Sequence, residues 1–387
     1  MSERVNEISP ANEVYRQLQR RIDELPVPFP RSDSGAEIRL LRALFDEEEA
    51  AVALELSAVA EPAGVIHRRV VRAGIQIDED HLSALLDALA AKGAIASGVT
   101  RVRSSGGYRT VRTYGLAPLV VGMFEFQVDR LTPEYVRDFH EYLDDGFRAS
   151  VVGVKTGQLR TVPVREEIVG ARAVGSYDDI RGYVRRHPGP FSVINCVCRQ
   201  SASLVGEACT TSSTHETCLM IGHVNPAGRE ISHEEVVSIL DRAEAEGHVL
   251  QPQNSRRPAF VCCCCRDCCE ILRNARKLPR PADAVPTAHL ARVRTDRCNG
   301  CGMCVKRCPM VAIALADRRA SVEESRCIGC GLCATTCPQD AISLARRRGS
   351  RRPPRSNTWM YLRMYLDRGG PLRLISIAAR KLLGKKI

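Results

Sequence analysis

The sequence lacks the long apolar runs, the apolar leader and the glycine-rich phosphate loops that identify several common classes of protein. No stretch reaches the roughly eighteen apolar residues that a membrane-spanning helix needs. The first residues, MSERVNEISPANEV, are polar and acidic where a secretory signal peptide would be apolar. Neither common glycine-rich phosphate-binding pattern occurs, so a nucleotide site is not indicated. We therefore expect a cytoplasmic protein, soluble or associated with a membrane only at its periphery.

The excess of positive over negative charge is confined to one segment. The formal net charge is +11, but residues 346–387 hold thirteen Lys or Arg residues and a single acidic residue, Asp367. That segment alone carries +12, so the other 345 residues sum to about −1. A basic tail can steer an acidic partner or an anionic membrane surface, whereas a nucleic-acid-binding body is itself basic. Nucleic acid is therefore not the expected partner.

Cysteine, in contrast, is abundant: the chain has eighteen, and eight of them form two quartets. Each quartet reads C-x-x-C-x-x-C-x-x-x-C-P, and the second repeats the first 29 positions later, which indicates an internal duplication. The quartets are Cys298, Cys301, Cys304 and Cys308, then Cys327, Cys330, Cys333 and Cys337. The intervening glycines tolerate positive φ and allow the backbone to curl around a cluster. In a reducing compartment these thiols are available to iron.

Residues 296–344 resemble a bacterial-type ferredoxin module with two [4Fe-4S] clusters. The resemblance rests on both complete quartets, on Pro309 and Pro338 after their last cysteines, and on the apolar flank that includes Ile313 and Ile342. It implies that the last cysteine of each quartet binds the other cluster. One ligand set would then be Cys298, Cys301, Cys304 and Cys337, and the other Cys327, Cys330, Cys333 and Cys308. Structural zinc would fit isolated C-x-x-C pairs, but two quartets that each end in Pro favour clusters.

Ten further cysteines lie between residues 196 and 269. Crowded thiolates repel one another unless a metal neutralises them, so bound metal is expected here too. The predicted ligands are Cys196, Cys198, Cys209, Cys218, Cys264, Cys265, Cys268 and Cys269. The nearby Arg199, His215 and Glu216 could donate hydrogen bonds to the metal ligands or carry protons, but they are interpreted as solvated loop residues.

Three interpretations of this second group compete. The first is one or two further [4Fe-4S] clusters, since such clusters take sets of four cysteines. The second is zinc in sites of four cysteines. The third is a catalytic cluster or reactive thiol site, with a faint similarity to the cysteine pairs of heterodisulfide-reductase-type subunits. Gly follows those pairs, whereas Arg266 and Asp267 follow Cys264 and Cys265 here.

The expected fold class is α+β with several domains. We predict a helical leader and linker at 1–34, a winged-helix-like domain at 35–117, a cysteine-rich middle domain at 118–285, a two-cluster ferredoxin module at 286–345, and a basic tail with an amphipathic helix at 346–387. The winged-helix prediction rests on helices followed by a hairpin at residues 99–103 and 108–114. The helix that would read a major groove begins with Glu79 and Asp80, which argues against DNA binding.

Several residue patterns predict where helices begin. Capping boxes predict starts at Ser34 with Glu37 and at Asp46 with Glu49. Other predicted starts are Asp78, Thr132 with Pro133, and Ser232 with Glu235. After a solvated arginine-rich linker, a short basic amphipathic helix is predicted from Pro371. It would contact an anionic membrane, an acidic partner or its own domain.

Together these features predict an iron-sulfur electron-transfer protein that relays electrons to or from an oxidoreductase partner. Two alternatives remain: a redox-sensing DNA-binding regulator that uses the winged-helix-like domain, and an oxidoreductase with a catalytic cysteine-rich cluster. An electron carrier or an oxidoreductase subunit fits the sequence better than a stand-alone enzyme. The sequence does not specify catalytic residues, a substrate or the redox partner.

Overall fold

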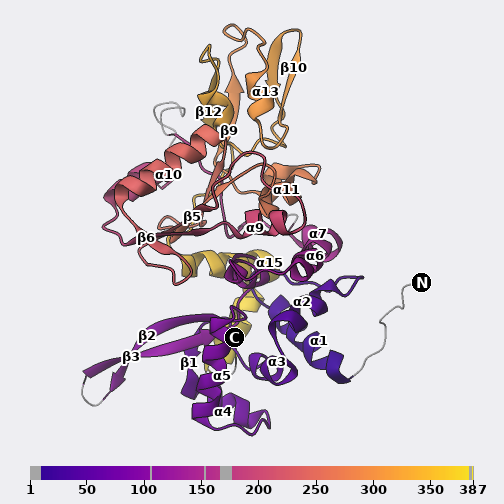
Figure 1. The fold of residues 1–387 in the computed structure, drawn as a ribbon, viewed down its shortest axis with the longest axis vertical. Coiled ribbons are helices and arrows are strands. Elements are labelled where there is room, and N and C mark those ends of the chain that lie inside the picture. The colour runs from indigo at the N-terminus through magenta and orange to yellow at the C-terminus, as the bar shows by residue number, and fades with distance from the viewer. Residues whose placement is uncertain (1–9, 105–106, 152–153, 166–176, 383–385, 387) are drawn as a thin grey trace. The chain divides into compact units, whose positions relative to one another are not determined.

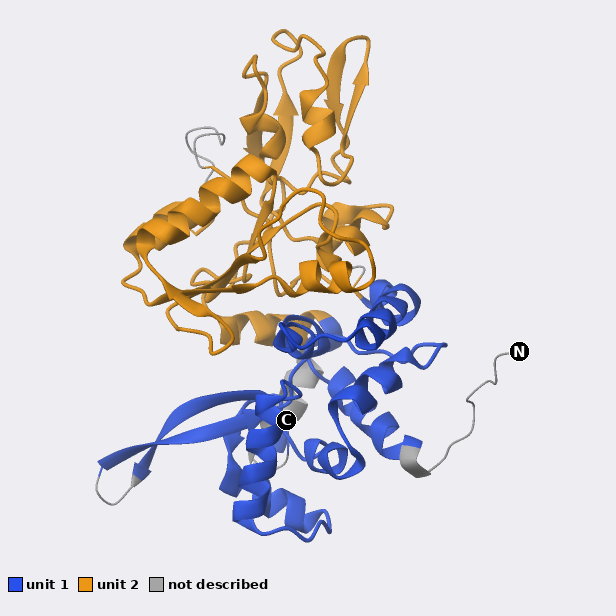
Figure 2. Ribbon diagram, viewed as in Figure 1, with its two compact units in different colours: residues 1–150, 368–387 blue, residues 151–367 orange. Residues whose placement is uncertain are grey.

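The computed structural model describes residues 10–104, 107–151, 154–165, 177–382 and 386, and it divides into two compact units (Figure 1, Figure 2). Unit 1 comprises residues 1–150 and 368–387, and unit 2 comprises residues 151–367. Helices and strands are mixed in both units, so the protein is of the α+β type. In the part that the structure describes, no helix is long and apolar enough to cross a membrane.

Unit 1 is mainly helical and has one small sheet. Its elements are α1 (Pro10–Asp23), α2 (Ala36–Leu44), α3 (Glu47–Ala53), β1 (Glu61–Pro62), α4 (Ala63–Arg72), α5 (Glu79–Ala91), β2 (Ala96–Ser104), β3 (Gly107–Gly115), α6 (Pro133–Tyr142) and α7 (Arg148–Ser150), with the short turns η1 (Leu119–Met123), η2 (Glu125–Gln127) and η3 (Leu143–Phe147). The three strands are antiparallel in the order β1-β3-β2.

Most predicted helix starts in this unit are confirmed. Asp46 and Glu49 form both hydrogen bonds of a capping box, and the Asp78 side chain accepts from the His81 N–H. The predicted start at Ser34 is wrong, because Gly35 is the N-cap of α2. Glu37 is instead buried, and its carboxylate accepts hydrogen bonds from Ser32 and from Arg16, at 2.7 Å for the latter.

Unit 2 is built on a five-stranded antiparallel sheet with the order β6-β4-β5-β8-β7. Its elements up to the ferredoxin-like part are α8 (Ile180–Arg186), β4 (Phe191–Asn195), α9 (Val197–Leu204), β5 (Glu216–Ile221), β6 (Arg229–Ile231), α10 (His233–Glu246), β7 (Val249–Pro252), β8 (Phe260–Cys264), α11 (Glu270–Arg276) and α12 (Pro281–Ala284). Ser232 caps α10 as predicted. One face of the sheet carries Val193, Leu219 and Val261, which pack into a core with Ile239 and Leu240 of α10.

The last part of unit 2 repeats one arrangement twice. It contains β9 (His289–Val293), α13 (Met303–Arg307), β10 (Ile313–Ala316), β11 (Arg319–Val322), α14 (Leu332–Thr335) and β12 (Ile342–Arg346). Strand β9 pairs with β12 and β10 pairs with β11, both antiparallel. The short helices α13 and α14 begin after Gly302 and Gly331, in the middle of each cysteine quartet.

The basic tail contains α15 (Asn357–Leu382), whose two helical segments meet at a kink at Gly370; the second segment begins at the predicted start, Pro371, and a further helical segment precedes it. The bend is at Gly370, whose φ of 66° only glycine adopts readily. Two tail cations of unit 1 are bound by that unit itself. Arg368 pairs with Asp23 at 3.1 Å, and Lys386 pairs with Glu55 at 2.7 Å. The arginine-rich segment is also not wholly solvated, since Arg347 donates to the backbone oxygen of Cys327 at 2.7 Å.

Candidate iron-sulfur and metal centres

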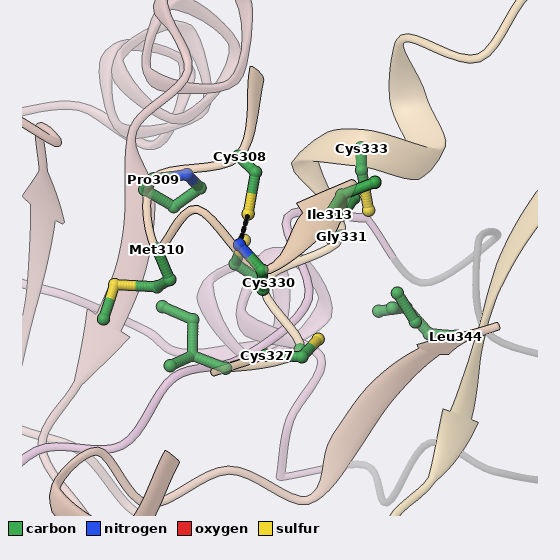
Figure 3. A pocket seen from close by; sticks show the side chains of 13 residues that line it. Cys308, Pro309, Met310, Ile313, Cys327, Cys330, Gly331, Cys333 and Leu344 are labelled. Atoms are coloured by element: carbon green, nitrogen blue, oxygen red, sulfur yellow. Dashed lines mark hydrogen bonds between the residues drawn. The ribbon is translucent and has the colours of Figure 1, made fainter. Parts of the chain in front are cut away.

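The first candidate centre is a pocket with an empty volume of about 330 Å³ that four cysteines from both quartets line. Cys327, Cys330 and Cys333 come from the second quartet, and Cys308 comes from the first (Figure 3). The rest of the lining is apolar and includes Met310, Ile313 and Leu344, which enclose the sulfurs. The pocket therefore offers four thiols in a dry environment.

A second pocket with an empty volume of about 320 Å³ mirrors the first. Cys298, Cys301 and Cys304 of the first quartet line it, together with Cys337 of the second. Cys301 is exposed while Cys304 is buried, so this pocket is closer to solvent than the first. The structure thus groups the eight cysteines in the two sets that the ferredoxin resemblance implies.

Glycine is required at two of the positions that shape these pockets. Gly300 has φ +72°, and a Cβ there would lie 2.5 Å from the backbone oxygen of Arg318. The equivalent Gly329 has φ +64°, and a Cβ would lie 2.3 Å from the backbone oxygen of His289. Both backbones must pass close to another backbone segment while turning in the left-handed region, which a side chain would prevent.

Backbone N–H groups point at the sulfurs in the same way in both repeats. Ala312 N–H donates to Cys308 Sγ and Ala341 N–H donates to Cys337 Sγ, each at 3.3 Å. Ala320 N–H also donates to Cys298 Sγ at 3.4 Å, and together with the Gly300 N–H it lowers the pKa of Cys298. Such donors stabilise negative charge on a thiolate or on a cluster sulfur.

Burial opposes the ionisation of the inner thiols. It raises the pKa of Cys330 and of Cys333, and neighbouring thiols add to the effect. Iron ligands must be thiolates, so the charge of these groups needs a compensating cation in the same pocket. A cubane cluster supplies iron at four corners, which matches four converging sulfurs.

A second set of thiols gathers on the other face of the five-stranded sheet. Along β8, Cys262 and Cys264 alternate with Val261 and Cys263, because successive side chains of a strand point to opposite faces. Cys263 pairs in register with the core residue Leu250, and its burial raises its pKa to about 12. Cys262 instead pairs with Cys218 of β5.

Six thiols form one connected network on that face, which we call the six-thiol network. It consists of Cys196, Cys198, Cys218, Cys262, Cys264 and Cys269. The sulfurs of Cys218 and Cys262 are 3.7 Å apart, and hydrogen bonds continue from Cys262 through Cys264 and Cys269 to Cys198 and Cys196. Hydrogen bonds that Cys262 and Cys269 accept lower their pKa values. Cys262 was not among the sequence-predicted ligands, although the period-two pattern of β8 could have identified it.

The other predicted ligands form a separate group beside α9, which we call the Cys₃Asp group. Cys209, Cys265, Cys268 and Asp267 each place one ligand atom within 4.8 Å of the others. Cys265 and Cys268 are buried against Ala202, apart from the main core. Burial would raise the pKa of Asp267, but hydrogen bonds from Thr210 outweigh it and lower the pKa. The sequence signal for Asp267 is its place inside the C-x-x-C pair.

Arg199 lies between the two groups and is only 1% exposed, so the expectation of a solvated loop residue is wrong for it. Its guanidinium hydrogen-bonds to Cys265 and is also attracted to Cys196 and Cys209. It donates to Thr217 Oγ1 at 3.2 Å and to the backbone oxygen of Thr214. Among the described residues no carboxylate forms an ion pair with it.

The buried His248 accompanies Arg199, with its Nε2 3.1 Å from the guanidinium. Arg only donates hydrogen bonds, so this nitrogen accepts and the ring is neutral. Burial, together with the Arg199 charge, lowers the pKa of His248 to about 3. Of the other residues predicted as solvated, His215 is exposed, and Glu216 forms an ion pair with Arg229 at 2.7 Å.

Hydrogen bonds to backbone oxygens join the cysteine-rich part of unit 2 to the ferredoxin-like part. The Val164 N–H donates to the backbone oxygen of Cys330 at 3.0 Å. Arg266, which follows the Cys265 thiol, donates to the backbone oxygen of Lys306 at 3.0 Å. Cysteine residues of the sheet and of both quartets also share one core cluster. The two parts are therefore packed together within one compact unit.

Comparison with known proteins identifies one region. Residues 291–344 match the family described as the 4Fe-4S dicluster domain. Neither a search of curated proteins nor a search of solved structures found a match. The match covers both quartets completely and three of the five residues of each framing strand, β9 and β12. Residues 291–344 are therefore a ferredoxin-like iron-sulfur module.

Proposed function

We propose that this chain is an electron-transfer protein whose module binds two [4Fe-4S] clusters. Cys298, Cys301, Cys304 and Cys337 would bind one cluster, and Cys327, Cys330, Cys333 and Cys308 the other. One observation carries the assignment: each pocket contains three cysteines of one quartet and the last cysteine of the other. This exchange follows from the duplicated fold and supports a two-cluster carrier.

When bound, such clusters supply one-electron redox chemistry at low potential. The chain's own contribution is to hold the sulfurs, to exclude water and to stabilise charge. Met310, Ile313 and Leu344 enclose the inner pocket and keep water away from its sulfurs. The N–H donors of Ala312 and Ala341 stabilise added negative charge, which favours the reduced state in both pockets.

The six-thiol network is proposed to hold a third iron-sulfur centre. Its sulfurs are contributed by β5, β8 and the starts of α9 and α11, so they are fixed by the sheet and two helix termini. Six thiols exceed the four that one cubane needs, and they are too crowded to remain without a cation. Hydrogen bonds from Val164 to Cys330 and from Arg266 to Lys306 join the rest of unit 2 to the ferredoxin-like part, which supports electron relay between them.

The small domain in unit 1 is proposed to be a winged helix that serves as a packing or docking element. The order of α2, α3, β1, α4, α5, β2 and β3 and the sheet order β1-β3-β2 support that fold. DNA binding is not favoured. Asp87 of α5 forms an ion pair with Arg112 at 2.5 Å and accepts a hydrogen bond from the Tyr114 hydroxyl. The charge of Arg112, one of the hairpin arginines, is therefore already balanced by a carboxylate. The acidic start of α5 repels phosphate.

Metal and sulfide analysis of anaerobically purified protein tests the proposal. We expect roughly twelve irons and twelve acid-labile sulfides per chain, with broad absorbance that a low-potential reductant bleaches, at four irons for each cubane. About eight irons would remove the third centre from the proposal but leave the carrier module. Colourless protein with fewer than about four irons would contradict the electron-transfer function itself.

A further inference from the structure

The Cys₃Asp group differs in kind from the iron-sulfur sites, and it carries an inference beyond the proposed electron transfer. We propose that Cys209, Cys265, Cys268 and Asp267 bind a single zinc ion in a closed, structural site. The ion would tie the loop between α9 and β5, which carries Cys209, to the segment between β8 and α11, which carries the other three ligands.

The spacing of the ligand atoms fits one tetrahedral ion. All four atoms lie within 4.8 Å of one another. Tetrahedral zinc with Zn–S bonds near 2.3 Å places its sulfurs about 3.8 Å apart. Cys209 Sγ is 3.7 Å from Asp267 Oδ1, which is a single-ion spacing.

The carboxylate is oriented as a monodentate ligand. Asp267 Oδ2 accepts from the Thr210 N–H at 2.8 Å and from Thr210 Oγ1 at 2.7 Å, so this oxygen is occupied. Oδ1 faces Cys209 and accepts one further hydrogen bond, from Thr211 Oγ1 at 3.2 Å. Hydrogen bonds of this type fix the orientation of metal ligands in many sites. Asp267 therefore presents a single oxygen toward the three sulfurs.

Arg199 provides an independent reason to expect an anionic metal site. Three thiolates and a carboxylate around Zn²⁺ give a site of net charge −2, and a buried cation beside it offsets half of that charge. Arg199 is buried, hydrogen-bonds to Cys265, and forms no carboxylate ion pair among the described residues. Burying this guanidinium is costly unless an anionic group remains beside it.

The ligand set also favours zinc over iron in this site. The pair Cys265 and Cys268 has the C-x-x-C spacing of zinc sites, and the third cysteine comes from a distant loop. Four protein ligands leave no open position, which is the property of a structural zinc site. The ion would hold the loop of residues 205–215 in place. This loop includes Thr214, whose backbone oxygen accepts a hydrogen bond from the Arg199 guanidinium.

X-ray absorption at the zinc edge of the full-length, anaerobically purified protein tests this inference without any variant. We expect about one zinc per chain with three sulfurs near 2.3 Å and one oxygen near 2.0 Å. A zinc shell of oxygen or nitrogen atoms alone would mean adventitious zinc and would overturn the proposal. So would a zinc content below about 0.2 per chain at full iron loading.

Two variants separate this site from the clusters. Cys268→Ser should remove the zinc and leave the iron content unchanged. The matched control is Cys263→Ala, on the core face of β8, which should retain both metals. Thr210→Val should weaken zinc binding about 10- to 100-fold in competition with a chromophoric chelator. Loss of about four irons in Cys268→Ser would assign a cubane here and overturn the single-ion site. Iron analysis alone decides the electron-carrier proposal, so the two can fail separately.

Discussion

The sulfurs of Cys218 and Cys262 lie 3.7 Å apart on neighbouring antiparallel strands, at positions that are direct partners in the sheet register. This pair anchors the six-thiol network to β5 and β8 and leaves Cys263, the next residue along, on the opposite face. Which of Cys262, Cys263 and Cys264 face the other thiols is therefore decided by strand alternation and not by proximity in sequence.

The first prediction compares two adjacent cysteines of β8. Cys262 lies between Cys218 and Cys264 in the six-thiol network, so we expect it to be one of the four ligands of the third centre, and Cys262→Ser should lower the iron content by about four per chain. Cys263→Ala should leave iron unchanged and cost on the order of 1 kcal/mol of stability, since it only trims a core side chain. Iron analysis and thermal unfolding of both variants provide the measurements. Equal iron contents in the two variants would contradict Cys262 as a ligand of the proposed third centre.

The second prediction uses pairs of substitutions to test the exchange of ligands between the quartets. Cys308→Ser combined with Cys330→Ser should lose only about four irons, because both residues line one pocket. Cys308→Ser combined with Cys304→Ser should lose about eight, because those residues line different pockets. Iron counts of the two double variants decide the matter. If the second pair lost no more iron than the first, each quartet would instead bind its own cluster.

The third prediction concerns the buried charge of Arg199. A unit charge roughly 8 Å away at an effective dielectric constant near 20 contributes about 2 kcal/mol, or roughly 90 mV for one electron. Arg199→Met should therefore shift the midpoint potential of the third centre by about that amount to more negative values. Arg185→Met, which removes an equal charge from an exposed position, is the control. EPR-monitored redox titration gives the potentials, and equal shifts in both variants would argue against a local effect.

The fourth prediction concerns acid stability. Burial and Arg199 lower the pKa of His248 to about 3, from 6.5 for a free side chain. The unfolded chain therefore binds one more proton than the folded protein between these values, and the contribution of His248 to stability falls as pH decreases through that window. Between pH 7 and pH 5 this loss amounts to about 2 kcal/mol.

The replacement His248→Gln keeps a hydrogen-bond acceptor for Arg199 but does not titrate. We expect the thermal unfolding midpoint of wild type to fall more than that of His248→Gln when the pH decreases from 7 to 5. Scans at one fixed rate are required, because unfolding of a metal-loaded protein is not reversible. Parallel decreases in the two proteins would show that His248 remains unprotonated in both states or titrates equally in both.

The local rules of helix capping were readable from sequence, and the long-range partners were not. Asp46 with Glu49 and Ser232 with Glu235 satisfy backbone donors three residues away, so the pattern alone locates them. Ser34 with Glu37 has the same pattern, but Arg16 and Ser32 bind the Glu37 carboxylate from elsewhere in unit 1. A tertiary contact thus overrides the local signal.

The candidate sites follow the same division. The quartets were readable because their spacing repeats, and the structure groups them as the resemblance implies. The division of the other ten cysteines depends on strand register and on where the loop of Cys209 folds back, and neither is encoded in local spacing. Arg199 was misread for the same reason, since its burial results from segments that are distant in sequence.

Cys308 lines the pocket of the second quartet and Cys337 lines the pocket of the first, and this exchange affects how the module is assembled. Neither half of the duplication has four cysteines around its pocket until the other half has folded beside it. On the proposed assignment, both halves must therefore fold before either cluster has all its ligands. A chain truncated after Thr336 would lack Cys337, the fourth cysteine of the first pocket, although every residue of the first quartet would still be present.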